Sequence, residues 1–222
     1  MTTLAMRKPH GDRGIEGLAA KWYAANTAEM MKEYVDLARR ISGQIPPDSA
    51  VLEVAPGPGY FCIELAKLGS YRITGLDISG SMVKIATRKA REAGVRADFK
   101  QGSASNIPFP KESFDFLLCR AAFKNFARPV EALQEMCRVL KPGGRAVIID
   151  LKRDASPQEV SREIDGMGLS WFNRIMTKGA FRLMLIKSAY TRAEFEQMLA
   201  QTRFSRVEIE ENGMGLQIAM TK

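Results

Sequence analysis

Hydrophobic residues recur at helical spacing near the start of the chain. Between Leu18 and Ile41 they follow one another every three or four residues, and Pro46-Pro47 then ends the pattern. This spacing predicts one or two amphipathic helices. We expect residues 1–47 to form an N-terminal helical cap that packs against the rest of the molecule.

After residue 47 short apolar runs alternate with helical segments. The predicted strands cover residues 51–54, 71–76, 95–100, 114–119 and 145–151. The predicted helices cover residues 60–68, 79–94 and 129–140, the second capped by Ser79 and the third stopped by Lys141-Pro142-Gly143-Gly144. Strands that alternate with helices form parallel units with right-handed crossovers. We therefore expect an α/β fold of the Rossmann-like, doubly wound type, with helices on both faces of a mostly parallel sheet.

The end of the chain predicts a different pairing of strands. Capping patterns at Ser156-Pro157 and at Thr191 mark the starts of two more helices. Two alternating runs, 207–210 and 216–219, then flank Asn212-Gly213, which is a typical hairpin dipeptide. The sheet should therefore end in an antiparallel pair.

A turn rich in proline and glycine follows the first predicted strand. In Glu53-Val54-Ala55-Pro56-Gly57-Pro58-Gly59, two glycines lie where the chain must turn into a helix, and they let a ligand approach the main chain. Asp77 ends the second strand, twenty residues after Gly57, where a carboxylate can accept hydrogen bonds from both hydroxyls of a ribose. Since ligands of such sheets bind at the carboxyl ends of the strands, these residues predict a nucleoside cofactor.

The glycine pattern separates the possible cofactors. A dinucleotide fingerprint needs a third glycine, and Cys62 stands at that position. A pyrophosphate is therefore disfavoured, and a nicotinamide-dependent dehydrogenase remains only as an alternative. No Gly-Lys-Ser/Thr sequence follows the turn, so it is not a Walker loop.

Several motifs, in order, resemble those of the class I S-adenosylmethionine-dependent methyltransferases. They are Val51–Gly59, Gly75–Ser79, Gly102–Ala104, Ile107–Phe109, Ser113–Asp115 and Arg138–Gly144. The resemblance covers roughly residues 48–151 and is similar in detail to the small-molecule branch that includes the ubiquinone/menaquinone C-methyltransferases. It implies a seven-stranded sheet with one antiparallel strand, S-adenosyl-L-methionine as cofactor, and a methyltransferase domain over residues 48–222.

The resemblance also implies roles for individual residues. The methionine part of the cofactor would be surrounded by Glu53, Ala55, Gly57 and Gly59, with Arg120 lining its far end. The ribose would be held by Asp77, and the adenine would contact Ile78, Met82, Ser103 and Ala104. This chain departs from the family in having Ala55 where a glycine is usual and Ser103 where an acid is common.

Methyl transfer to an oxygen or to an acidic carbon needs a base, and the sequence offers no histidine after the fourth strand, where many relatives have one. That position reads Phe123-Lys124-Asn125-Phe126. We expect catalysis mainly by proximity, with Lys124 and Asn125 orienting the acceptor. Further candidate bases are Asp150, Tyr23 and Tyr60.

The expected acceptor is a small and apolar molecule. We expect it to contact Tyr23, Phe123 and Trp171. Tyr23 and its neighbour Trp22 either close over the cofactor or pack in the core of their helix. An insertion at about 152–190 contains the basic and aromatic segment 171–186, which is either packed on the domain, a lid over the acceptor, or a transient contact with a membrane surface.

Charge and cysteine content limit the partners. The net charge is +8, but the densest basic cluster, Lys84 to Arg91, has the spacing of a solvated helix face, so we expect no nucleic-acid partner. A nucleic-acid methyltransferase and a cofactor-binding protein without transfer activity remain as alternatives. Three scattered cysteines and a single histidine predict reduced thiols and no metal. The first residues lack the apolar run of a secretory signal, and we expect a cytoplasmic protein. The sequence leaves the identity of the acceptor and the oligomeric state open.

Overall fold

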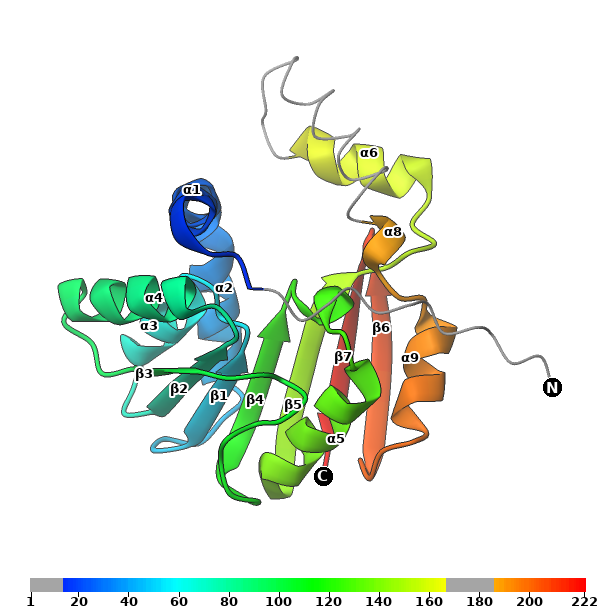
Figure 1. Ribbon diagram of the computed structural model, residues 1–222. Coiled ribbons are helices and arrows are strands. Elements are labelled where there is room, and N and C mark those ends of the chain that lie inside the picture. The colour runs from blue at the N-terminus through cyan, green and yellow to red at the C-terminus, as the bar shows by residue number, and fades with distance from the viewer. Residues whose placement is uncertain (1–13, 167–185) are drawn as a thin grey trace.

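The computed structural model describes residues 14–166 and 186–222, and within these ranges the chain forms one seven-stranded sheet. Its strands are β1 (Ala50–Val54), β2 (Arg72–Asp77), β3 (Asp98–Gln101), β4 (Phe114–Arg120), β5 (Leu140–Leu151), β6 (Arg206–Asn212) and β7 (Gly215–Thr221). The order across the sheet is β3-β2-β1-β4-β5-β7-β6 (Figure 1). Strands β1 to β5 are parallel, and β7 is antiparallel to both β5 and β6. The expected fold class and the antiparallel end of the sheet are confirmed.

Helices cover the sheet on both faces (Figure 1). The described helices are α1 (Gly17–Thr27), η1 (Ala28–Met30), α2 (Met31–Ser42), α3 (Tyr60–Ala66), α4 (Gly80–Glu92), η2 (Phe123–Asn125), α5 (Pro129–Val139), α6 (Pro157–Gly166), α8 (Ile186–Ser188) and α9 (Arg192–Leu199). Helices α5 and α9 pack on one face, and α2, α3 and α4 lie on the other.

The alternation of side chains along β4 builds both cores. Leu117 and Cys119 point toward α5 and α9, whereas Phe116 and Leu118 point toward α2 and α3, and all four are fully buried. A central parallel strand is covered on both sides, which explains why its sequence is a continuous apolar run and not an alternating one.

Local capping signals predicted the helix starts correctly. The Ser79 hydroxyl accepts a hydrogen bond from the amide of Met82 at 3.0 Å at the start of α4. Thr191 and Glu194 form a complete capping box at the start of α9. These side chains satisfy amide groups that the first helical turn leaves without a helical partner.

The predicted stop between α5 and the fifth strand is wrong in detail. The helix ends at Val139, and β5 already begins at Leu140, which pairs with Phe114. Arg145 pairs with Phe116, so the residues between Leu140 and Arg145 bulge out of the strand instead of preceding it. The Lys141 ammonium lies 2.8 Å from both carboxylate oxygens of Asp115, which anchors the bulge. An ion pair over this separation leaves no local signal in the sequence.

Part of the expected insertion is outside the described residues. Residues 167–185 contain Trp171 and most of the basic and aromatic segment, so neither is placed here. Among the helices that the structure does describe, none has the length and apolar character needed to cross a bilayer.

Candidate functional site

A cavity opens at the carboxyl ends of β1, β2 and β4. β1 lies between β2 and β4 in the sheet, so this is the point where the strand order reverses and where open α/β sheets bind ligands. Many of the residues that the sequence predicted for a site lie in its wall, namely Tyr23, Glu53, Ala55, Gly57, Asp77, Ile78, Met82, Ser103, Ala104, Arg120 and Asn125. Gly59, Lys124 and Phe123 are described but are not part of the wall.

The turn after β1 presents bare main chain to the cavity. Ala55 and Gly57 both have positive φ, at 57° and 55°. The amide of Ala55 donates to the Leu76 carbonyl at 2.7 Å, which extends the pairing with β2 by one residue before the chain turns. A Cβ atom on Gly57 would meet only the Tyr23 ring, at 3.8 Å. The space over Gly57 is therefore open for a ligand.

Gly59, for which the resemblance implied a contact with the cofactor, is not part of the cavity wall and is closely packed. A Cβ atom at Gly59 would lie 2.8 Å from the Phe99 ring and 2.9 Å from Ala86. Its φ of 78° also belongs to the left-handed region. Gly59 thus allows α3 to begin close to β3 and α4, and it stands behind the cavity.

Asp77 is held with its carboxylate toward the cavity. One oxygen accepts from the amide of Gly57 at 2.9 Å and the other accepts from the amide of Ser79 at 2.8 Å. The residue is buried, and this burial raises the pKa of its carboxyl group, while the two amide hydrogen bonds oppose the rise. A carboxylate oxygen can accept more than one hydrogen bond, so both remain able to bind a pair of hydroxyl groups.

Next to Asp77 the wall becomes apolar. Ile78 and Met82 line it at the start of α4, and Ala104 lines it from the loop after β3. Ser103 lies beside them, and its hydroxyl accepts a hydrogen bond from the amide of Ser105 at 3.2 Å. The start of α4 and the loop after β3 together suit a flat apolar group with polar edges.

Glu53 at the end of β1 is buried beneath the turn. The Cys62 thiol donates to one of its carboxylate oxygens at 3.0 Å. Burial raises the pKa of Glu53 to about 7, against the lowering effects of the Cys62 hydrogen bond and the charge of Arg120. The cavity therefore contains a carboxyl group that changes its charge near neutral pH.

Arg120 at the end of β4 supplies the positive charge of the cavity wall. Its guanidinium lies 4.5 Å from the centre of the Tyr34 ring and forms an ion pair with Glu33 at the start of α2. The side chain is 15% exposed. This cation lies at the opposite side of the turn from Asp77 and links the sheet to α2.

The N-terminal helices form a roof over the cavity. Tyr23, Thr27, Met30 and Tyr34 all line it, at intervals of four, three and four residues. This is the spacing of one helix face, so the signal was present in the sequence, although only Tyr23 was predicted. Trp22 meets neither of its two expected roles, because it is not part of the cavity wall and, at 71% exposed, it does not pack in the core.

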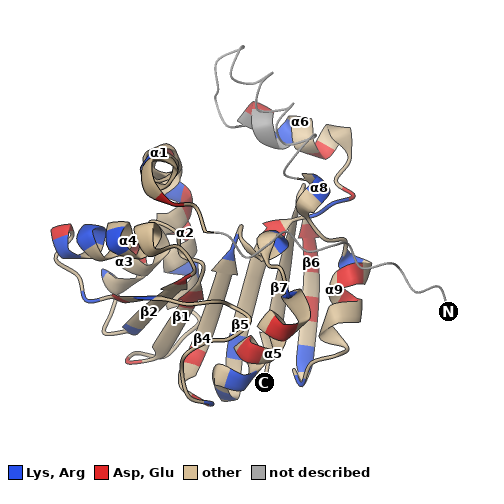
Figure 2. Ribbon diagram, viewed as in Figure 1, with Lys and Arg blue, Asp and Glu red and all other residues tan. Residues whose placement is uncertain are grey.

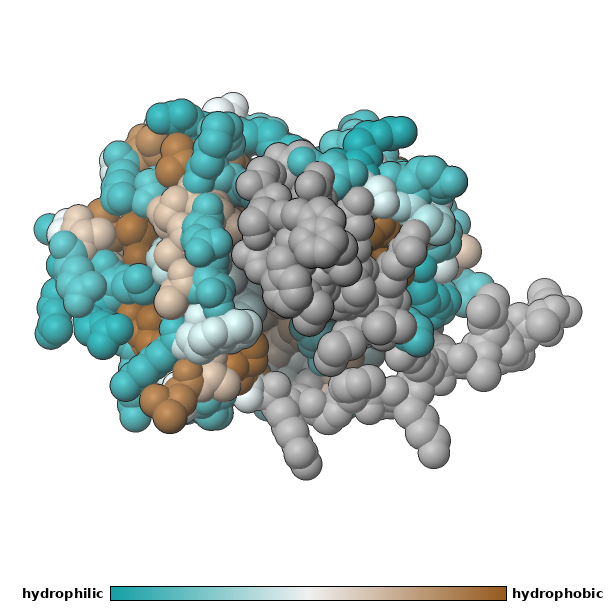
Figure 3. All heavy atoms as spheres, turned by 90° about the horizontal axis from the view of Figure 1, so that it is seen from above, coloured by the Kyte–Doolittle hydropathy of each residue, from teal (hydrophilic) through white to brown (hydrophobic). Residues whose placement is uncertain are grey.

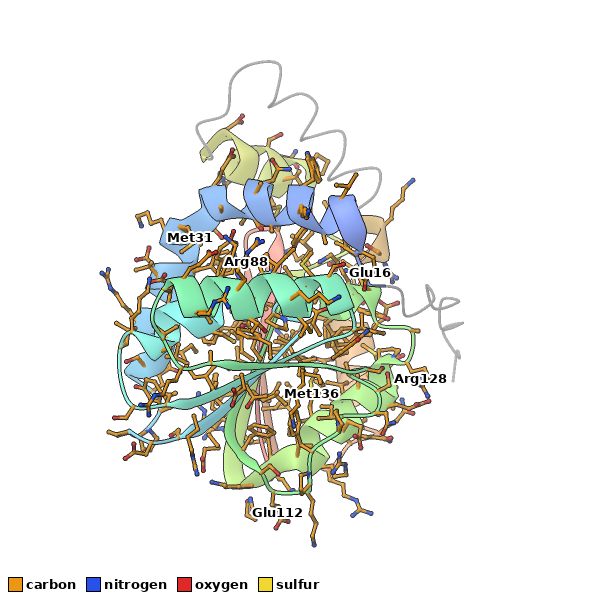
Figure 4. All side chains as sticks on the ribbon, turned by 60° about the vertical axis from the view of Figure 1, so that its left-hand side comes forward. Glu16, Met31, Arg88, Glu112, Arg128 and Met136 are labelled. Carbon is orange, nitrogen blue, oxygen red and sulfur yellow. The ribbon has the colours of Figure 1, made fainter. Side chains whose placement is uncertain are left out.

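The roof is fastened to the start of α4. The Glu16 carboxylate accepts from the amides of Gly80 and Ser81 at 2.9 and 3.0 Å, and the Ser79 hydroxyl donates to the Ile15 carbonyl at 2.6 Å. Figure 4 shows Glu16 between the beginning of α1 and the N-terminal end of α4. A carboxylate at a helix N-terminus is favoured by the free amides and by the helix dipole.

The floor after β4 is held by a buried ion pair. The Lys124 ammonium lies 2.8 Å from an Asp150 carboxylate oxygen and 2.6 Å from the Ala121 carbonyl, and the two charged side chains are 6% and 2% exposed. The other oxygen of Asp150 accepts from the Lys124 amide at 2.9 Å. These bonds hold Ala121 at a φ of 56° and place Asn125 in the wall.

Phe123 and Tyr60 lie outside the cavity wall, whereas Tyr23 lies in it. Phe123 is fully buried and packs against Phe126 and Phe195 in the core, so it does not contact the cavity. The Tyr60 hydroxyl donates to the Ala24 carbonyl and so supports the roof. Burial raises the pKa of Tyr23, which keeps its hydroxyl protonated near neutral pH and unsuited to act as a base.

The part of the chain that resembles known proteins includes the turn after β1, Asp77 and Arg120. Residues 52–148 match the family described as "Methyltransferase domain". A demethylmenaquinone methyltransferase of Deinococcus radiodurans is 40% identical over 107 residues, which are 48% of this chain and 44% of that protein. A ubiquinone/menaquinone biosynthesis C-methyltransferase of Geotalea daltonii is 36% identical over 108 residues, 47% of this chain and 46% of that protein. The matched part thus spans about half of this chain and less than half of each relative.

Solved structures extend the similarity of the fold to most of the chain. A crystal structure described as a putative S-adenosyl-L-methionine-dependent methyltransferase of Methanococcus maripaludis has a TM-score of 0.72 at 22% identity and covers 95% of this chain and 94% of that one. One from Aquifex aeolicus, described as a SAM-dependent methyltransferase, has a TM-score of 0.63 at 19% identity, with 83% and 88% covered. At these identities the likeness concerns the fold.

Proposed function

From the match of residues 52–148 to a methyltransferase domain, we propose that this protein transfers the methyl group of S-adenosyl-L-methionine to a small, apolar acceptor. The observation that carries the proposal is the position of Asp77. Its buried carboxylate lies at the edge of the sheet and accepts a hydrogen bond from the amide of Gly57. The space above the main chain at Gly57 is free for a ligand. Bare main chain beside an acidic anchor suits a nucleoside that lies flat on the turn.

The nucleoside half of the cofactor fits the wall around Asp77. The two carboxylate oxygens of Asp77 would accept from the ribose hydroxyls, a charge-assisted pair of hydrogen bonds. The adenine would lie against Ile78 and Met82, with its edge toward Ser103 and Ala104. Since Ser103 already accepts from the amide of Ser105, its contact with the base would be weaker than that of a carboxylate.

The amino-acid half fits the opposite side of the turn. Glu53 would attract the ammonium group, and Arg120 would attract the carboxylate. Both charged side chains line the cavity, and Ala55 lines it as well. The cavity thus offers one acidic and one cationic side chain to the two opposite charges of a zwitterionic ligand.

The bound cofactor supplies a methyl group on a positively charged sulfur, which is already electrophilic. The protein has to hold the acceptor in line with that methyl group and to keep water out. Tyr23 and Tyr34 in the roof exclude water, and the Asn125 amide orients the acceptor from the floor. Lys124 acts through its ion pair with Asp150, which holds Ala121 and Asn125 in position, and not by touching the acceptor.

The acceptor class is supported by the remaining wall and by the relatives. Beyond the residues assigned to the cofactor, the cavity is lined by Thr27, Met30, Ala122 and Phe126, which favour an apolar molecule. The named relatives act on demethylmenaquinone or in ubiquinone and menaquinone biosynthesis. We propose an aromatic or quinone-like ring as the acceptor.

Calorimetry tests the cofactor half of the proposal directly. S-adenosylhomocysteine should bind the parent protein, and Asp77→Asn should weaken binding about tenfold or more, because the negative charge is lost and one of the two acceptor oxygens is replaced by an NH2 donor. Asp98→Asn, at an exposed aspartate on β3, is the matched control and should bind like the parent. No measurable binding by the parent protein, or equal binding by both variants, contradicts the proposal. Turnover of demethylated quinones then tests the acceptor.

A further inference from the structure

Helix α1 is apolar on its outward side as well as on its inward side. Its sequence, Gly17–Thr27, contains a single charged residue, Lys21. On the inward side Ala20 and Ala24 are buried against Met82 and Ile85 of α4. A helix that lacks a polar face is normally covered all round, yet α1 lies at the surface.

The outward side carries the most exposed large hydrophobic residues among the described parts of the chain. Leu18 is 81% exposed and Trp22 is 71% exposed, and they lie one turn apart on the same face as Ala25. Ile15, just before the helix, is 41% exposed. Scattered exposed apolar residues are ordinary, but a row of them beside a ligand cavity marks an interaction surface.

Basic residues of the neighbouring helix α4 lie on one side of this row, whereas the exposed acids Glu29 and Glu92 lie at the C-terminal ends of the two helices, where Glu92 pairs with Arg88. Helix α4 lies beside α1, and it exposes Lys84, Arg88 and Arg91 (Figures 2 and 4). Seen from above, hydrophobic side chains lie at the surface of the molecule among hydrophilic ones (Figure 3). The acidic residue nearest to the start of α1 is Glu16, and its carboxylate is bound by amides of α4. A net charge of +8 adds to the positive potential.

From these observations we infer that the outward face of α1 rests on an anionic lipid surface. Trp22 and Leu18 enter the boundary between headgroups and acyl chains, Lys21 extends to the headgroups, and the cations of α4 interact with lipid phosphates. A tryptophan, aliphatic side chains and basic residues on one face are the chemistry of an interfacial helix. One short helix, about 16 Å long, offers far less than the roughly 800 Å² per partner that a stable protein dimer buries.

Docking of this face would place the lipid and the cavity on opposite sides of one helix. The inward face of α1 contributes Tyr23 and Thr27 to the cavity wall, whereas Leu18 and Trp22 face outward. An apolar acceptor dissolved in the bilayer would then reach the cavity past the edge of the roof. That last step rests on the proposed function, whereas the docking itself does not.

Binding to vesicles tests the inference with the full chain and without any methyl donor. In a Trp171→Phe background Trp22 is the single tryptophan, so its fluorescence reports on α1 alone. With vesicles of phosphatidylcholine and phosphatidylglycerol we expect a blue shift of the emission, and co-sedimentation that weakens as salt is raised. Pure phosphatidylcholine vesicles should bind less.

Substitution of the apolar row provides the decisive comparison. Leu18→Ser with Trp22→Ser, in the otherwise parental chain, should lower the partition coefficient about tenfold or more. The matched control is Val207→Ser, at an apolar residue of β6 that is 39% exposed and should partition like the parent. Retained binding of S-adenosylhomocysteine checks that the double variant is folded, and it separates this test from that of the cofactor site. Unchanged partition of the double variant, an emission that vesicles do not shift, or self-association in sedimentation velocity that the double substitution abolishes would each overturn the inference.

Discussion

The thiol of Cys62 donates a hydrogen bond to the carboxylate of Glu53 at 3.0 Å, and both side chains are shut off from solvent. Cys62 occupies the position at which a dinucleotide-binding turn would have its third glycine. Here a side chain at that position supports an acidic residue beneath the turn. The difference from a dinucleotide site is therefore a gain of one polar contact and not simply a lost glycine.

The raised pKa of Glu53 predicts how stability depends on pH. The folded protein keeps a proton on Glu53 up to a pKa of about 7, while the unfolded chain releases it near its ordinary value of 4.5. Between these values the folded state binds more protons, so the free energy of unfolding should fall as pH rises, by about 3 kcal/mol in total from this group. Urea unfolding at a series of pH values would measure it.

The comparison that isolates Glu53 is Glu53→Gln, which cannot titrate. Its unfolding free energy should fall less steeply between pH 4.5 and 7 than that of the parent, whereas Glu131→Gln, at an exposed glutamate of α5, should follow the parent. Parallel curves for the parent and Glu53→Gln would rule out a buried, titrating carboxyl group. Above pH 7 the two proteins should differ by a constant amount.

Two glycines of the same turn should respond differently to alanine. Gly59→Ala should lower the free energy of unfolding by about 2–5 kcal/mol, because its Cβ meets Phe99 and Ala86 and its φ is positive. Gly57→Ala should cost only about 1–2 kcal/mol, from the positive φ alone. Binding of S-adenosylhomocysteine should show the reverse order among the folded proteins, with the larger loss at Gly57. Equal losses of stability would mean that the two positions do not differ as described.

Local signals explain what the sequence predicted, and tertiary contacts explain what it did not. Gly57, Asp77 and Ser79 could be predicted because a tight turn, the end of a strand at a ligand site and a helix cap each favour a particular type of residue. The ion pair of Lys124 with Asp150 joins residues 26 positions apart, and only the packing of η2 on β5 brings them together. The burial of Phe123 has the same origin, since a short 3-10 turn gives no periodicity from which its inward face could be recognised.

Replacement of Ala121 by glycine should stabilise the folded protein. Its φ of 56° places an L-residue in the left-handed region, which costs roughly 1–2 kcal/mol and exceeds the entropy lost by glycine on folding. We expect Ala121→Gly to unfold at a higher temperature, by an amount corresponding to about 1 kcal/mol or less. The neighbour Ala122 has a φ of −126°, so Ala122→Gly is the control and should not stabilise the protein. A stability loss in Ala121→Gly would contradict this explanation of the turn.

Removal of one partner from the Lys124–Asp150 pair should be severe. Lys124→Met leaves a buried carboxylate without its counter-charge, and we expect a loss of about 3–5 kcal/mol in the free energy of unfolding. The double variant with Asp150→Leu should lose less than Lys124→Met, because no lone charge remains. Lys32→Met, which breaks the exposed pair with Asp36, should change stability far less than Lys124→Met, because solvent screens that pair. If the double variant were the least stable of the three, the buried charge would not be the cause.

The contact of Glu16 with α4 should affect the affinity for the cofactor. Glu16→Ala removes the acceptor for the amides of Gly80 and Ser81, which begin the helix three residues after Asp77. A helix N-terminus favours a nearby carboxylate, so the start of α4 beside Asp77 should be held less firmly without Glu16. We therefore expect S-adenosylhomocysteine to bind about two- to fivefold more weakly. Glu29→Ala, at an exposed glutamate of η1, is the control. An unchanged dissociation constant for Glu16→Ala would show that the roof is held without this contact.

The two halves of the cavity come from separate stretches of the chain. The residues assigned to the donor run from Glu53 to Arg120, inside the region that matches the methyltransferase domain, whereas Tyr23, Thr27, Met30 and Tyr34 precede that region. Under the proposed function, exchange of the leading helices would change the selectivity for the acceptor and leave the residues assigned to the methyl donor in place. A chimera that exchanges these helices between homologous chains would transplant substrate preference without rebuilding the sheet.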